Sequence, residues 1–190
     1  MKNLLLIPVL VMALASVKAS DLPTLSIAKD KSFVLNANDW KMDELTVSFL
    51  SSDGEEIYSE IFQPSDKKIR KYNLRELPAG TYTVVVANYS KSISYDLVYA
   101  GDLVTEVSEG EIYYTPQVFS DDQKIDINLL SLNKKVKIYL SDASGHGLHS
   151  EVIKHAPVVT RRINISGLNK GMYSLSINVD DKWYNHTIIK

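Results

Sequence analysis

Residues 168–179 read LNKGMYSLSINV, and residues 77–88, which lie 91 positions earlier, read LPAGTYTVVVAN. Both stretches place a tyrosine two positions after a glycine, and apolar residues then recur at every second position. A period of two is typical of a β-strand with one face in a protein core and the other in water. The two stretches therefore predict that one β-structured unit occurs twice in this chain.

The same offset relates identical residues on both sides of these stretches without a gap. The pairs are Gly54 and Gly145, Ser59 and Ser150, Glu60 and Glu151, Arg70 and Arg161, Asn73 and Asn164, and Lys91 and Lys182. Self-similarity at one fixed spacing is the sequence signature of a repeated fold. We expect two tandem copies, separated near residues 100–110.

Seven short strands are expected in each copy, and no segment after residue 19 shows the apolar stripe of a helix. In the first copy they cover Thr24–Ala28, Ser32–Asn36, Glu44–Ser51, Glu56–Gln63, Lys67–Leu74, Thr81–Asn88 and Ser92–Tyr99. In the second they cover Glu111–Thr115, Lys124–Leu130, Lys135–Ser141, Gly147–Lys154, Val158–Ile165, Met172–Val179 and Lys182–Ile189. The count predicts an all-β protein of two immunoglobulin-like antiparallel β-sandwich domains.

Six residues are expected to shape the turns between strands, three in each copy. They are Gly54, Gly80, Tyr82, Gly145, Gly171 and Tyr173. The first glycine of each copy closes a hairpin, and the second is expected to take a positive φ, which glycine adopts without steric cost. Each tyrosine is expected to bury its ring and to place its hydroxyl at the rim, where it finds a partner.

The N-terminus carries the pattern of a secretory signal peptide. Lys2 precedes an apolar run from Leu4 to Ala15, and Val17 and Ala19 are small enough to precede a cleavage site. The alternative is a membrane anchor, but roughly twelve apolar residues fall short of the ~20 that cross a bilayer. We expect a signal peptide at residues 1–19, a first sandwich at 20–104 and a second at 105–190.

Composition limits the compartment and the partners. Without Lys2 and Lys18 the chain keeps 19 basic residues against 23 acidic ones, a net charge of about −4. The cations are scattered and form no basic patch, which disfavours nucleic acid as a partner. An exported chain without cysteine must fold without disulfides. We expect an exported bacterial protein, periplasmic, cell-surface or secreted, that does not span the membrane after cleavage.

The residues show no pattern of a catalytic, cofactor or metal site. His146 and His149 flank a hairpin, but a zinc site needs three or four ligands in fixed geometry. No Gly-x-Ser-x-Gly elbow or phosphate-binding loop occurs after residue 19. We therefore expect no enzyme activity, no cofactor and no bound metal.

Aromatic residues are the only indication of a binding site. Trp40 stands in a loop, and Trp183 and Tyr184 follow a turn next to the last strand. Exposed rings at these three positions could stack on sugars or contact a protein. The alternative is that strand alternation buries Trp183 or Tyr184 in the core.

The second copy resembles the C-terminal sorting domain of the Bacteroidetes type IX (Por) secretion system. The resemblance rests on the stretch KVKIYLSDASG at 135–145, on INISGL at 163–168, on KGMYSL at 170–175 and on the final TIIK at 187–190. It implies a β-sandwich that acts as an export signal. Small secreted immunoglobulin-like proteins of the same bacteria are similar as well.

These observations lead to three hypotheses about function. The first is a non-catalytic exported module of the envelope or cell surface that contacts other proteins or mediates adhesion. The second is a carbohydrate-binding accessory protein that uses exposed aromatic residues. The third is a type IX sorting domain. The expected partner is accordingly a protein or a glycan at the cell envelope.

Overall fold

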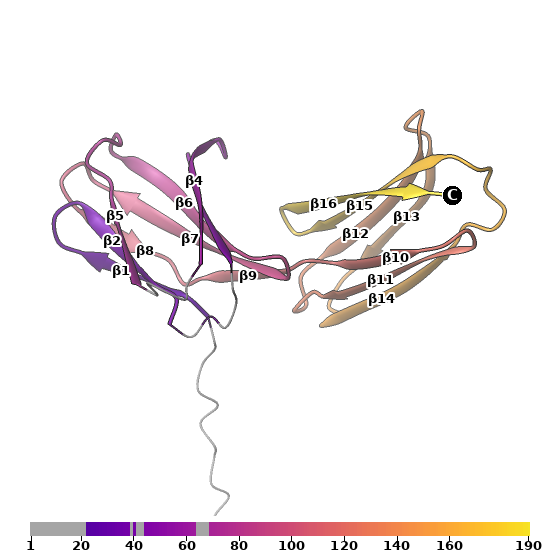
Figure 1. Ribbon diagram of the computed structural model, residues 1–190, viewed down its shortest axis with the longest axis horizontal. Coiled ribbons are helices and arrows are strands. Elements are labelled where there is room, and N and C mark those ends of the chain that lie inside the picture. The colour runs from indigo at the N-terminus through magenta and orange to yellow at the C-terminus, as the bar shows by residue number, and fades with distance from the viewer. Residues whose placement is uncertain (1–21, 39, 41–43, 64–68) are drawn as a thin grey trace, which may run out of the picture.

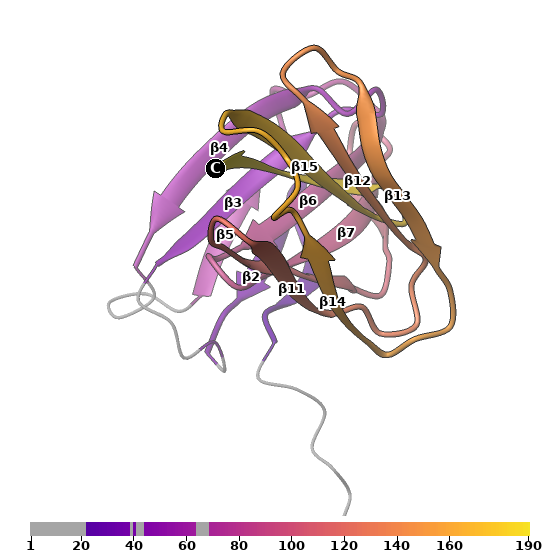
Figure 2. The same ribbon diagram turned by 90° about the vertical axis from the view of Figure 1, so that its right-hand side faces the viewer.

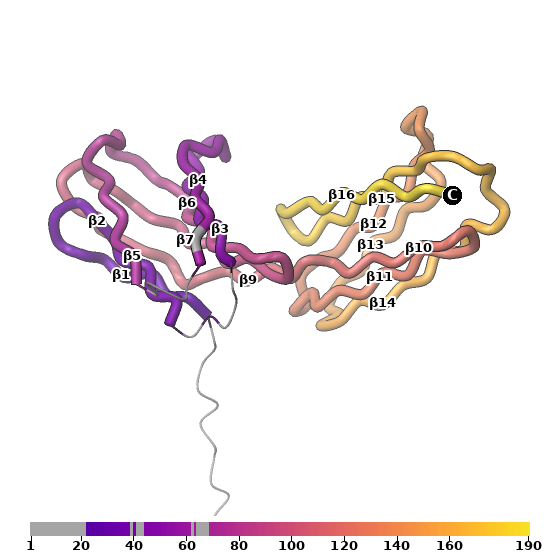
Figure 3. Tube along the Cα trace, in the orientation of Figure 1, coloured from indigo at the N-terminus to yellow at the C-terminus, as the bar shows by residue number. Residues whose placement is uncertain are grey.

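A computed structural model describes residues 22–38, 40, 44–63 and 69–190. The predicted signal peptide, residues 1–19, lies outside the described residues. Two β-structured units lie side by side along the longest axis, and the chain crosses between them once (Figures 1 and 3). The part of the chain described contains strands and turns but no helix, and so no helix that could cross a membrane.

The first unit is a sandwich of two antiparallel sheets. One sheet has the order β1-β2-β5, and the other has the order β4-β3-β6-β7-β8, with β9 also paired to β7. The strands are β1 (Thr24–Ala28), β2 (Ser32–Asn36), β3 (Leu45–Leu50), β4 (Glu56–Phe62), β5 (Ile69–Asn73), β6 (Gly80–Ala87), β7 (Lys91–Tyr99), β8 (Val104–Val107) and β9 (Glu111–Tyr114).

The second unit repeats this arrangement. Its sheets have the orders β10-β11-β14 and β13-β12-β15-β16. The strands are β10 (Gln117–Ser120), β11 (Lys124–Leu130), β12 (Val136–Asp142), β13 (Gly147–Ile153), β14 (Val158–Asn164), β15 (Met172–Val179) and β16 (Lys182–Ile189). The equivalent strands of the first unit are β1 to β7 in the same order. The predicted all-β, immunoglobulin-like fold is confirmed.

Alternation of side chains explains why each sandwich closes. In β3 and β12, buried and half-buried residues alternate, and the inward residues belong to two separate hydrophobic cores. Burial of each large apolar side chain contributes roughly 1.5–3 kcal/mol. The equivalence extends to irregularities, because β3 shifts register after Phe49 against β4, and β12 shifts after Leu140 against β13.

The segment between the sandwiches differs from the prediction. The strand expected to open the second copy exists as β9, but its backbone pairs with β7 of the first sandwich. The first strand of the second sandwich is instead β10, which directly follows Pro116 and was not predicted. The sequence Gln117–Ser120 is too short to show a clear alternation of apolar and polar residues.

Candidate functional site

The two hairpin glycines have the same backbone conformation. Gly54 and Gly145 both have φ of +80°. The amide of Gly54 donates to the Ser51 carbonyl oxygen at 2.9 Å, and the amide of Gly145 donates to the Asp142 carbonyl oxygen at 3.0 Å. A side chain at either position would be strained in this backbone conformation.

The prediction of a positive φ is wrong for Gly80 and Gly171. Among the described glycines, only Gly54, Gly101 and Gly145 have positive φ. Gly80 begins β6, and a Cβ at this position would meet the Tyr82 ring at an ordinary 3.9 Å. Nothing in the structure explains why glycine stands at position 171.

Tyr82 and Tyr173 form the same contact in the two sandwiches. Both rings are buried. The Tyr82 hydroxyl donates to the Pro78 carbonyl oxygen at 2.7 Å, and the Tyr173 hydroxyl donates to the Asn169 carbonyl oxygen at 2.6 Å. A tyrosine that bonds back to a carbonyl four residues earlier is the tyrosine corner of sandwich folds. The same hydrogen bond thus anchors the ring in both sandwiches.

Trp40 offers no exposed ring to a ligand, contrary to expectation. Its side chain is only 2% exposed and belongs to the first core. The Lys91 ammonium lies 4.9 Å from the centre of its ring. A position in a loop does not determine whether a large apolar side chain points toward the core or toward solvent. Here the Trp40 side chain packs in the core.

Trp183 is exposed, and a second ring accompanies it. The Trp183 side chain is 53% exposed on the outer face of the sheet formed by β12, β13, β15 and β16. The Tyr139 ring on β12 is stacked with it, with 6.1 Å between ring centres and 25° between planes. The rings lie on either side of β15, whose outward residues Ser176 and Asn178 pair with these strands. The pair therefore forms an aromatic ledge on the outer face of this sheet.

The neighbouring Tyr184 points the other way. It is packed against the second core, and burial raises its pKa to about 12. His186 follows it on the same side of β16, and burial lowers the pKa of its imidazole. Of the three aromatic residues proposed as ligand contacts, only Trp183 presents a well-exposed ring.

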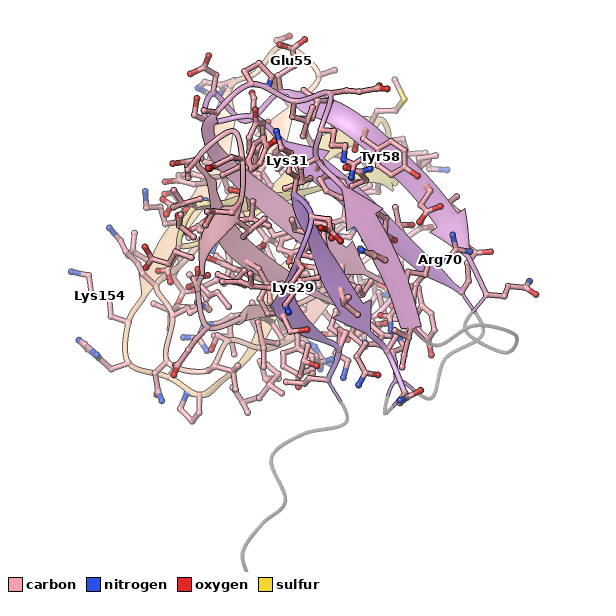
Figure 4. The ribbon with its side chains drawn as sticks, turned by 90° about the vertical axis from the view of Figure 1, so that its left-hand side faces the viewer. Lys29, Lys31, Glu55, Tyr58, Arg70 and Lys154 are labelled. Atoms are coloured by element: carbon pink, nitrogen blue, oxygen red, sulfur yellow. The ribbon has the colours of Figure 1, made fainter. Side chains whose placement is uncertain are left out.

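An aromatic groove of about 700 Å³ opens in the first sandwich between β4 and β5. The Phe49 ring lies at its base, 5.3 Å from the Tyr58 ring and 5.2 Å from the Tyr72 ring. Figure 4 shows Tyr58 and Arg70 on this side of the sandwich. The Tyr72 hydroxyl donates to the Glu60 carboxylate at 2.6 Å, and this bond, after burial, raises the pKa of Tyr72.

The Glu60 carboxylate is fully engaged at this edge. Arg70 donates to it at 3.0 Å, and the equivalent Arg161 donates to Glu151 at 2.8 Å in the second sandwich. Repetition of the ion pair indicates that it fastens β4 to the opposite sheet. A carboxylate held in this way is a poor candidate for proton transfer.

Side chains from both sandwiches contact one another at the junction between them. The Tyr113 side chain of β9 lies in the second core, although its backbone belongs to a sheet of the first sandwich. The Lys134 ammonium lies 4.3 Å from the centre of this ring and also bonds to Glu111, which holds the pKa of that carboxyl below its usual range. The Lys182 ammonium bonds to Ser92 across the junction. No pattern in the sequence predicts this cluster.

The histidines do not converge on a common site. His146 Nδ1 lies 3.9 Å from Asp142, and His149 Nε2 lies 4.0 Å from Glu151. Within the described ranges no three His, Cys, Asp or Glu side chains are grouped so that they could hold a metal ion.

Residues 117–190 match the family described as "Secretion system C-terminal sorting domain". The match begins at the first residue of β10 and includes every strand of the second sandwich. A tail of this family implies a protein that is exported to the cell surface or secreted. No curated protein matches the chain in sequence.

Solved structures with a similar fold have very different sequences. A two-domain fibronectin type III segment of chicken tenascin is 8% identical, covers 88% of this chain and 99% of its own, and has a TM-score of 0.33. The BSP domain of a biofilm-associated protein is 16% identical, covers 87% and 29%, and has a TM-score of 0.29. The alpha chain of the chicken interferon gamma receptor is 9% identical, covers 88% and 97%, and has a TM-score of 0.30. Likenesses at this level carry no argument about function.

Proposed function

We propose that the second sandwich is a type IX sorting tail and that the first sandwich is a non-catalytic module which this tail delivers to the cell surface. The observation that carries the proposal is the match of residues 117–190 to the sorting family, because its limits coincide with one complete sandwich. The delivered sandwich offers a groove lined by both aromatic and charged side chains, a chemistry suited to contact with another macromolecule.

A fusion experiment tests the sorting role. Residues 111–190 are fused to the C-terminus of a periplasmic reporter in a host with a type IX system, and surface display is measured by protease accessibility on intact cells. Residues 20–115 serve as the matched control, because they keep β8 and β9, which pair with β7, and lie outside the family match. Display is expected only with residues 111–190. Retention of both fusions in the periplasm contradicts the proposal.

A second candidate function is carbohydrate binding through the aromatic ledge of Tyr139 and Trp183. The exposed Trp183 ring on a face with serine and asparagine side chains combines a stacking surface with hydrogen-bonding groups. Calorimetric titration with envelope and host glycans tests it, with Trp183→Ala as the variant and Tyr89→Ala, an exposed tyrosine of the first sandwich, as the control. Absence of heat with every glycan removes this candidate.

A further inference from the structure

The two sandwiches leave the same edge strand open. β4 and β13 are equivalent, and each is the last strand of its sheet. Figure 2 shows β13 along one flank of the second sandwich, beside β12. Among the described sheet-edge strands longer than five residues, β14 contains Arg161 and Arg162 and β16 contains Lys182, whereas β4 and β13 contain no lysine, arginine or proline. Lysine, arginine and proline are common protective residues at open edges, whereas β4 and β13 have a register shift and one inward glutamate each.

Both open strands expose apolar side chains at the same positions. Ile57 is 41% exposed and its equivalent Leu148 is 39% exposed; Ile61 is 65% exposed and its equivalent Val152 is 52% exposed. Most buried positions keep an apolar residue in both copies because the core requires it. An apolar residue that recurs in solvent has no such reason, and it marks a surface that contacts something.

The residue order of β13 is complementary to itself. When a second β13 is laid antiparallel with Ser150 opposite Ser150, Leu148 faces Val152 on the outer face, and His149 faces Glu151 on the inner face. Directly opposite residues lie about 4.5–5.5 Å apart between Cβ atoms. Apolar residues therefore meet apolar ones, and a basic group meets an acidic one. His149 Nε2 has no hydrogen-bond partner among the described residues and lies 4.0 Å from Glu151 of its own chain, which Arg161 holds.

The equivalent strand shows the same symmetry independently. Around Ser59, Ile57 would face Ile61, and Tyr58 would face Glu60. The two strands share only the serine and the glutamate, yet both keep the order apolar, polar, serine, polar, apolar. Recurrence of the pattern with different residues indicates that the pattern itself is retained.

We infer that two copies of this chain pair through β13, antiparallel and centred on Ser150, so that two four-stranded sheets join into one. The contact is isologous, because each copy presents the same strand to the other. A single pair of edge strands buries less than the roughly 1,200–2,000 Å² of a stable interface, so the association is weak and depends on concentration. It is independent of the sorting role proposed above.

A cysteine scan tests the register directly, because the natural chain contains no cysteine. Ser150→Cys is expected to form a disulfide-linked dimer under mild oxidation at least about tenfold faster than Ser174→Cys, since only position 150 brings two Cβ atoms within reach. Ser174 is the matched control, because it is exposed on the same face but lies on the interior strand β15. Equal rates overturn the inference, as does cross-linking that occurs only when Ser59→Cys is mixed with Ser150→Cys.

Analytical ultracentrifugation of the purified protein gives a second measurement. The natural chain is expected to increase in mean mass with concentration, Ser150→Lys to weaken the association at least about tenfold, and Ser174→Lys to leave it unchanged. A natural chain that remains monomeric up to about 1 mM overturns the inference. A loss of association in Ser174→Lys equal to that in Ser150→Lys also overturns it.

Discussion

The two sandwiches share a skeleton but have different cores. The tyrosine corner, the hairpin glycine and the ion pair between edge strand and opposite sheet recur with the same offset. Where the first core stacks Phe33, Phe49 and Tyr72, the second has Ile125, Leu140 and Ile163. Backbone geometry thus depends on a few turn and rim contacts, whereas core side chains can change from aromatic to aliphatic if they still fill the space.

The largest effect is expected from Phe49→Ala. Removal of this buried ring should lower the free energy of unfolding of the first sandwich by about 3–5 kcal/mol, since it leaves a cavity among three other rings. The chain has two tryptophans, one in each sandwich, so fluorescence in a denaturant titration separates them when Trp40→Phe and Trp183→Phe backgrounds are used. Leu140→Ala is the matched change in the second sandwich. Equal shifts of both signals in Phe49→Ala would show that the sandwiches unfold as one unit.

A smaller effect on stability is expected at Lys190 and Tyr99, two equivalent positions whose different side chains both donate to carbonyl oxygens of a turn. Lys190 donates from Nζ to the carbonyl oxygens of Ile165, Ser166 and Leu168 at 2.6–2.8 Å. The equivalent Tyr99 donates to the Gly101 carbonyl at 2.7 Å.

Lys190→Met should lower the free energy of unfolding of the second sandwich by about 1–3 kcal/mol, the range for hydrogen bonds from a charged donor. Tyr99→Phe should cost the first sandwich about 0.5–1.5 kcal/mol. Urea titration measures both. A Lys190→Met variant as stable as the natural chain would contradict a role of this ammonium in holding the turn.

The tyrosine corners should give equal effects. Tyr82→Phe and Tyr173→Phe each remove one hydroxyl that bonds to a carbonyl, which should cost about 1 kcal/mol in the respective sandwich. Thermal unfolding followed by circular dichroism checks both variants. A difference well above that value would show that the corner supports one sandwich more than the other.

The smallest expected effect is the loss of stability of the second sandwich when the pH is lowered. His186 has its equivalent in Tyr95, whose hydroxyl bonds to the Pro23 carbonyl. Burial lowers the pKa of His186 below its ordinary 6.5, so the unfolded chain binds a proton at a higher pH than the folded chain. Stability of the second sandwich should therefore fall as the pH decreases through about 6.5, and level off below the folded pKa. His186→Gln should remove this slope in denaturant titrations between about pH 7.5 and 5, whereas an unchanged slope would assign it to other groups.

Alternation of side chains allowed the strands to be predicted, and the constant offset gave their equivalence. β11, β15 and β16 begin and end where the pattern indicates, because a period of two is set by local geometry. The pairing partner of β9 was not predictable, since it depends on contacts with β7 far from it in sequence. The φ of Gly80 was not predictable either, because several turn geometries accept a glycine.

The candidate site was only partly visible in the sequence. Exposure of Trp183 follows from alternation along β16, but its partner Tyr139 lies two strands away and appears only when the sheet order is known. Trp40 lies outside any strand, so no period indicates its side. Strands β4 and β13 could be predicted from the sequence, but not that both lie at the edge of a sheet. Only at an edge can their palindromic residue order pair with a second copy.

Strand β9 belongs to both halves of the protein, because its backbone pairs with the first sandwich and its Tyr113 ring lies in the second core. A cut before Glu111 removes the strand that lies beside β7, and a cut after Tyr114 takes the Tyr113 ring out of the core it fills. Tension applied across the molecule would have to peel this strand from one half or extract its ring from the other. The connection between the halves is therefore a shared strand, and a fragment of either half needs Glu111–Tyr114 to keep its own contacts.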